Sequence, residues 1–259
     1  MNQNELKKSL AKLPLGEIKY FDSTGSTNDE ALAWAAGDAK DMSLVVADEQ
    51  TAGRGRLDRK WFTPPGTALA FSLILRPTPN EKPYLSRIVG LAALSVAEPL
   101  VRRGLSARIK WPNDVLLNEC KVAGILTESV WSGDQVDCVV IGIGVNILKG
   151  STPLQARLEF PATSLEDALG QPVERVEVLR DILAALVSLR PQLHTDKLMT
   201  KWEELLAYRG RQVQVETGDQ GSITGIVTGL ERDGSLQLRA EDGKLRTVRF
   251  GDVRLRPFA

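Results

Sequence analysis

Basic residues are concentrated in one glycine-rich segment, GRGRLDRKW at 53–61, which carries three arginines and one lysine against a single aspartate. The chain as a whole is balanced, with 33 basic and 33 acidic residues. Glycines between the arginines leave the backbone N–H groups accessible, and guanidinium groups bind phosphate or carboxylate in bidentate fashion. The pattern predicts a local anion site; the alternatives are a solvated basic loop and a segment that contacts RNA.

Two further clusters could contribute to such a site. KWPND at 110–114 is followed by Lys121 and Gly124 in KVAGIL, although lysines at strand ends are usually solvated edge residues. GIGVN at 142–146 ends an apolar strand in glycines, which would let a ligand lie against the backbone. It lacks the third glycine and the following helix of a dinucleotide-binding motif, so a Rossmann fold is excluded.

Composition excludes several other kinds of chemistry. His194 is the only histidine, and Cys120 and Cys138 lack metal-ligand spacing, which argues against a zinc site, a metal site of any other kind and a histidine-dependent triad. A net charge of zero argues against binding to nucleic acid or an anionic membrane. No signal sequence and no membrane-spanning run is recognised, so we expect a cytoplasmic protein without a membrane partner.

The elements that position these clusters follow from hydrophobic periodicity. Short apolar or β-branched runs predict strands at 18–21, 44–47, 68–75, 107–111, 114–117, 121–130 and 136–143. Helical spacing predicts helices at 5–13, 84–103, 176–189 and 196–208, and one that starts near Thr27. Thr27 and Glu30 have the spacing of a capping box, Pro99 marks a kink or an early end, and Asn118-Glu119 forms a tight hairpin turn.

These elements predict an α+β fold in which a mixed, mostly antiparallel sheet packs against helices. The loop of about twenty residues after the strand at 44–47 is long enough to suggest a functional role. After Arg209-Gly210 the composition changes to short alternating runs separated by glycine-containing turns. We therefore expect a catalytic domain over 1–209 and a small C-terminal β-barrel over 210–259.

Six motifs together resemble the biotin protein ligase family, whose members attach biotin to the carrier domains of carboxylases. STN, QTAGRGR, RKW, KWPND, KVAGIL and GIGVN occur here in the family's order and approximate spacing, between about residue 20 and residue 150. The C-terminal barrel fits as well. The resemblance implies a biotin/lipoate ligase-like catalytic core followed by a small barrel of the Src-homology-three-like kind.

The resemblance also implies a reaction with biotin and MgATP as substrates. The biotin carboxylate attacks the α-phosphate to give biotinyl-5'-AMP and pyrophosphate, and a lysine of a biotin carboxyl carrier protein then takes the biotin. Fixed cations must offset the repulsion between the two anions. By resemblance Lys121 faces both anions, and Arg54 and Arg56 belong to the loop that closes over them; we expect that loop to be mobile in the free protein.

The remaining residue roles also come from the resemblance. The residues implied to bind biotin are Ser26, Thr27, Gln50, Gly53, Arg54, Lys121, Gly124, Gly142 and Gly144. The residues implied to bind the nucleotide are Arg56, Trp61, Asn113, Lys121 and Asn146. Ser23-Thr24 offers a second Ser-Thr pair, and Ser26-Thr27 is preferred because Asn28 completes STN. Residues of the adenine pocket lie outside the short motifs, with FPATSL at 160–165 as a candidate.

The implied partner is the biotin carboxyl carrier domain of a biotin-dependent carboxylase, and a homodimer is left open. The 25 residues before Ser26 are too few for a winged-helix module, so no DNA binding is expected. A lipoate or octanoate ligase is the nearest alternative, although its pattern lacks the GRGR loop. A protein that only binds RNA would leave KWPND, Lys121 and GIGVN unexplained.

Overall fold

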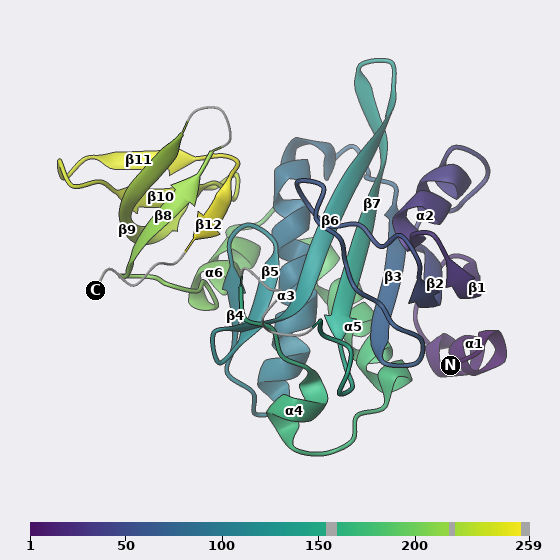
Figure 1. Cartoon of the computed structure of the whole chain (residues 1–259). Helices are drawn as coiled ribbons and strands as arrows, with labels where there is room; N and C mark the ends of the chain where they lie inside the picture. Colours follow the sequence, from purple (N-terminus) through teal and green to yellow (C-terminus); the bar gives the residue numbers. More distant parts are fainter. Residues whose placement is uncertain (154–159, 218–220, 255–259) are drawn as a thin grey trace.

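The computed structural model of the chain describes residues 1–153, 160–217 and 221–254, which form two sheets (Figure 1). The larger sheet has seven strands in the order β1-β2-β3-β7-β6-β5-β4. They are β1 (Ile18–Thr24), β2 (Ser43–Gln50), β3 (Ala68–Leu75), β4 (Ala107–Lys110), β5 (Asp114–Leu117), β6 (Cys120–Ser132) and β7 (Gln135–Asn146). Only β1 and β2 pair in parallel, so the mixed, mostly antiparallel sheet is confirmed.

The helices cover both faces of this sheet. They are α1 (Gln3–Leu10), α2 (Thr27–Ala35), η1 (Lys82–Arg87), α3 (Ile88–Arg102), α4 (Leu165–Leu169), α5 (Arg175–Leu189), η3 (Arg190–Gln192) and α6 (Asp196–Glu204). The stretch Lys82–Arg102 is long and apolar enough to cross a membrane by composition alone, but 67% of its most apolar window is buried inside the protein. It is a core helix, packed between the large sheet and α5.

Side-chain alternation along the strands separates two cores. On β3, Leu69, Phe71 and Leu73 face the large core with α3 and α5, whereas Ile74 joins a smaller cluster with α2. Cys138 is buried in that smaller cluster, while Cys120 is only partly buried. The α2 side of the sheet therefore has less apolar cover and leaves room for a binding site.

Several local predictions are confirmed and others are wrong. The Asn118-Glu119 turn joins β5 to β6 with positive φ at both residues, as a tight hairpin requires. The capping box is wrong: Ser26 occupies the N-cap position of α2 without a side-chain capping hydrogen bond, Thr27 donates to Gln50, and Glu30 accepts from Thr24.

One predicted element end is confirmed and two differ from the structure. α3 continues past Pro99 to Arg102, next to the predicted end at 103. α6 ends at Glu204, because the residues after it bond to the open edge of β4 through Ile109. The strand predicted to end at 143 continues to Asn146, because pairing with both β3 and β6 keeps its glycines extended.

The C-terminal sheet has five antiparallel strands in the order β11-β10-β9-β8-β12. They are β8 (Gln212–Glu216), β9 (Ser222–Leu230), β10 (Leu236–Arg239), β11 (Leu245–Val248) and β12 (Asp252–Arg254). This small β unit agrees with the predicted fold class, and 218–220 and 255–259 lie outside the described residues. It lies beside β4 and α6, at one end of the large sheet (Figure 1).

Candidate active site

A cavity of about 720 Å³ opens on the α2 side of the large sheet, next to the loop of residues 51–67. It collects residues from all six motifs. Every predicted site residue except Gly53 lines it: Ser26, Thr27, Gln50, Arg54, Arg56, Trp61, Asn113, Lys121, Gly124, Gly142, Gly144 and Asn146. Gly53 has a packing role in the loop: a Cβ there would lie 2.4 Å from the carbonyl oxygen of Trp61, so this glycine lets the loop pair with itself, and its predicted contact with biotin stays a prediction.

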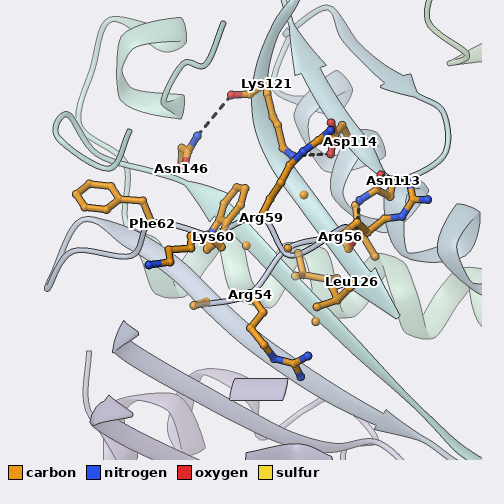
Figure 2. A pocket seen from close by; sticks show the side chains of 18 of the residues that line it. Arg54, Arg56, Arg59, Lys60, Phe62, Asn113, Asp114, Lys121, Leu126 and Asn146 are labelled. Atoms are coloured by element: carbon orange, nitrogen blue, oxygen red, sulfur yellow. Dashed lines mark hydrogen bonds and ion pairs between the residues drawn. The ribbon is translucent and has the colours of Figure 1, made fainter. Parts of the chain in front are cut away.

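Lys121 lies in the cavity wall at the start of β6 and is fixed at both ends. Its Nζ lies 2.6 Å from Oδ1 of the buried Asp114. The other carboxylate oxygen of Asp114, Oδ2, lies 3.6 Å from Lys110 Nζ. The Asn146 amide lies 3.4 Å from the Lys121 carbonyl oxygen and 3.2 Å from that of Thr163 (Figure 2). Asn146 therefore holds the backbone on which Lys121 is mounted.

Arg56 reaches the same cavity from the loop. Its Nη1 donates to Asn113 Oδ1 and to the Gly251 carbonyl oxygen, both at 3.2 Å. Burial lowers the pKa of the Arg56 guanidinium, and the charges of Asp252 and Asp114 offset part of that effect. A desolvated cation of this kind gains more from an incoming anion than an exposed one does.

Arg54 has a different environment from the one predicted. Its guanidinium lies 2.8 Å from Glu128 and 2.6 Å from Asp29, and it points away from Lys121 (Figure 2). Burial lowers the pKa of Arg54, but hydrogen bonds and charges from these two carboxylates outweigh it, so the pKa is raised. In this arrangement Arg54 ties the loop to α2 and β6, and its charge is paired with two carboxylates of the protein.

Ser26, Thr27 and Gln50 form a group of polar, uncharged side chains in the part of the cavity near α2. Gln50 Oε1 accepts hydrogen bonds from the Thr27 backbone N–H (2.8 Å) and hydroxyl (3.1 Å), while Gln50 Nε2 donates to Thr63 (3.1 Å). Ser23 and Thr24 bond instead to glutamates outside the cavity, so the Ser26-Thr27 pair is the one that faces it.

Gly142 and Gly144 were predicted to make room for a ligand. In the structure they make room for two side chains of the protein itself. A Cβ on Gly142 would lie 2.1 Å from Asn28 Oδ1, and one on Gly144 would lie 2.2 Å from the Trp61 indole. Asn28 in turn bonds to Glu128 and Ser72. The Trp61 Nε1–H is buried and has no hydrogen-bond partner in the described part of the chain, so it is a donor open to an acceptor on a bound molecule.

Because Gly142 makes room for Asn28, we expect Gly142→Ala to be destabilising. The added methyl would displace a buried amide that makes two close hydrogen bonds, and overpacking of this kind costs about 1–3 kcal/mol. Urea unfolding measures the loss. Gly37→Ala is the matched control, because its nearest atom would be at an ordinary 3.5 Å. Equal unfolding free energies for the two variants would contradict the packing argument.

Sequence reasoning missed several cavity residues. Lys110 and Asp114 were visible as letters of KWPND but received no role, although their charges surround Lys121. Phe160 and Ala162, within the segment suggested for the adenine pocket, both line the cavity. Asp252 comes from β12 in the C-terminal sheet, and no local pattern marks it.

Comparison with known proteins gives a consistent result. Residues 20–146 match the biotin/lipoate A/B protein ligase family, and residues 209–256 match the biotin protein ligase C terminal domain. The biotin--[acetyl-CoA-carboxylase] ligase of Paracoccus denitrificans is 38% identical, covering 85% of this chain and 93% of that protein. The bifunctional ligase/repressor BirA of Bacillus subtilis is 33% identical, covering 98% of this chain and 79% of that protein.

Similarity extends to solved structures. The biotin protein ligase from Aquifex aeolicus in complex with biotin and ATP matches with a TM-score of 0.78 at 31% identity, covering 93% of this chain and 98% of that chain. Both sheets and their connection are thus shared over nearly the whole chain.

Proposed function

The chain belongs to the biotin protein ligase family, and we propose that its cavity joins the carboxylate of biotin to the α-phosphate of ATP. The enzyme is an ATP-dependent ligase that activates biotin as biotinyl-5'-AMP and transfers the biotin to a lysine of a biotin carboxyl carrier protein. The observation that carries the residue assignment is the convergence of Arg56 and Lys121, from a loop and from a sheet, on one cavity.

The first half-reaction needs two anions to approach each other. A carboxylate oxygen of biotin attacks the α-phosphorus of MgATP, the bond from that phosphorus to the bridging α,β-oxygen breaks, and pyrophosphate leaves. Lys121 and Arg56 stabilise the charge on the transferred group, and Asn113 and Asn146 hold these two cations in place. The magnesium enters with ATP as part of the substrate; no group of three or more His, Cys, Asp or Glu side chains that could hold a metal occurs among the described residues.

The group of uncharged polar side chains near α2 suits the ureido ring of biotin, which presents one carbonyl acceptor and two N–H donors. Ser26, Thr27 and Gln50 offer hydroxyl and amide groups of both kinds without a net charge. A lipoyl or octanoyl group has no ureido ring, so it would form no hydrogen bonds with these hydroxyl and amide groups. This contrast favours biotin over the alternative acyl substrates.

In the second half-reaction a lysine amine of the carrier attacks the carbonyl carbon of the mixed anhydride, and AMP leaves.

We propose two units, 1–209 and 210–259, of which the first holds the reacting groups. The proposed location is the cytoplasm, which agrees with the free thiols of Cys120 and Cys138.

Substrate-dependent pyrophosphate release tests this assignment directly. With MgATP, biotin should trigger release of pyrophosphate, and lipoate and octanoate should not. A thermal shift with biotin plus ATP provides an independent readout, since a ligand stabilises the folded state that it binds. Release with lipoate and none with biotin would overturn the proposed substrate.

Arg56→Gly should let the adenylate escape while its formation partly survives. The variant removes the loop cation that bridges Asn113 and the C-terminal sheet, and hydrogen bonds of charged groups contribute about 1.5–3 kcal/mol, or roughly ten- to hundredfold in escape rate. Rapid filtration of enzyme loaded with labelled biotinyl-AMP measures the half-life. Arg246→Gly, on an exposed strand, is the control; equal half-lives for Arg56→Gly and the parent would remove Arg56 from this role.

A further inference from the structure

The C-terminal sheet reaches the cavity through two consecutive residues. The Gly251 carbonyl oxygen accepts from Arg56, and Asp252 lines the cavity. The Asp252 carboxylate lies between two cations of the catalytic region, with Oδ2 2.5 Å from Arg59 Nη2 and Oδ1 3.4 Å from Lys110 Nζ. One short segment of the small sheet therefore contacts both the loop of residues 53–61 and the KWPND motif.

The surroundings of Asp252 differ from those of a surface ion pair. The side chain of Asp252 is 13% exposed and that of Lys110 is 5% exposed. The Arg59 side chain, which belongs to the loop of residues 53–61, is 46% exposed. Burial raises the pKa of Asp252, but Lys110 and Arg59 outweigh it and hold the pKa below its ordinary value of 3.8. Asp252 is therefore charged at neutral pH, and its bond to Arg59 is a charge-assisted one.

Three contacts between the small sheet and the catalytic region fix the position of the sheet and of Asp252. The buried Trp111 Nε1–H donates to the Gly234 carbonyl oxygen (2.9 Å) in the turn between β9 and β10. The same turn packs on Trp202 so closely that a Cβ on Gly234 would lie 2.8 Å from the indole. Arg87 donates to the carbonyl oxygen of Arg232 (2.7 Å).

Trp111 and Lys110 are neighbours in KWPND, so the same segment contacts the turn of the small sheet and its Asp252. Asp252 lies in β12, which pairs with β8 of the same sheet. The contacts that hold the sheet against the catalytic region therefore also fix the position of the Asp252 carboxylate. The C-terminal sheet can therefore restrain the loop of residues 53–61 through the contact between Asp252 and Arg59.

We propose that Asp252 is a positioning residue that latches the loop of residues 53–61 over the cavity by holding Arg59, and so retains the adenylate. The inference rests on the proposed function, because retention is defined by that intermediate. Asp252 acts through Arg59 and the loop, so it should affect how long the adenylate stays bound more than how fast it forms.

A double-mutant cycle tests the latch. Asp252→Asn, Arg59→Gln and the double variant are each loaded with labelled biotin and MgATP, and formation and escape of the adenylate are measured separately. The cycle isolates the pair from other contacts of either side chain. Asp242→Asn is the matched control, because that aspartate pairs with Arg246 at 3.0 Å on the exposed part of the same sheet.

We expect each single variant to shorten the half-life of the bound adenylate roughly threefold to tenfold, with formation changed less. The double variant should be no worse than the more affected single one. Asp242→Asn should match the parent. A role confined to folding would lower the unfolding midpoint without this split between formation and escape, and Arg59→Gln, at the exposed side, tests the pair if Asp252→Asn folds poorly.

The outcomes separate this inference from the function on which it rests. If the parent enzyme forms no adenylate from biotin and MgATP, the proposed function fails. If the parent forms and retains it, and Asp252→Asn and Arg59→Gln retain it equally well, the latch is wrong while the function stands. Additive effects in the double variant would also contradict the latch, because they would show that the two residues act independently.

Discussion

Lys121→Ala should slow adenylate formation by roughly 10²- to 10³-fold. Lys121 is the cation that β6 presents to the cavity, and the loss of one preorganised group of this kind raises the barrier by about 2.7–4 kcal/mol. Single-turnover measurement of biotin-dependent pyrophosphate release gives the rate. The effect should fall on the chemical step, because the uncharged polar groups near α2 still bind the ureido ring.

The control for this variant is Lys40→Ala, whose ammonium is exposed and 3.9 Å from Glu17. It should release pyrophosphate at the parental rate. Biotin affinity, measured by calorimetry, should change much less in Lys121→Ala than the rate does. Near-parental pyrophosphate release in Lys121→Ala would show that another group carries the charge stabilisation.

Asp114→Asn should lower the free energy of unfolding by about 3 kcal/mol. The buried carboxylate pairs with Lys121 at 2.6 Å and with Lys110 at 3.6 Å, and removal of one partner of a buried pair leaves the other charge uncompensated. Asparagine keeps the size but removes the charge, so the loss reports electrostatics more than packing. Urea unfolding measures it.

Asp242→Asn again supplies the comparison, since its partner Arg246 is half exposed and an exposed pair contributes at most about 1 kcal/mol. In Asp114→Asn, Lys110 still pairs with Asp252. Lys121 loses the only carboxylate with which it pairs in the part of the chain that the structure describes. Equal stability of Asp114→Asn and Asp242→Asn would show that the cavity is more hydrated than its burial indicates.

The sequence was sufficient to predict the strands and most helices because their patterns are local. The run at 68–75 is apolar on both faces and becomes β3 with the predicted bounds. Asn118-Glu119 requires positive φ and adopts it. Errors occurred where a distant partner decides: Thr27 bonds to Gln50 in place of capping its helix, and pairing on both sides extends β7 through GIGVN.

The same distinction applies to the site. The motifs, through their resemblance to the family, pointed to twelve of the residues that line the cavity. They did not show that Gly142 and Gly144 make room for Asn28 and Trp61, since this depends on which chain segment packs against the sheet. They gave no sign of Asp252, which lies 142 residues from Lys110 in the chain.

Arg54 illustrates the limit of reasoning from residue type. Its position between glycines in a basic loop suggested a cation for the reacting anions, and only the fold shows two carboxylates already beside it. The loop therefore divides its arginines: Arg54 anchors it to α2 and β6, Arg56 faces the cavity, and Arg59 meets the C-terminal sheet.

The most direct test of the proposed reaction is the intact mass of a biotin carboxyl carrier domain incubated with the enzyme, biotin and MgATP. The account predicts that the carrier gains the mass of one biotinyl group on a single lysine, that the gain requires ATP, and that Lys121→Ala abolishes it on the same time scale. An unchanged carrier mass with active parent enzyme, or the same gain with lipoate in place of biotin, would contradict it.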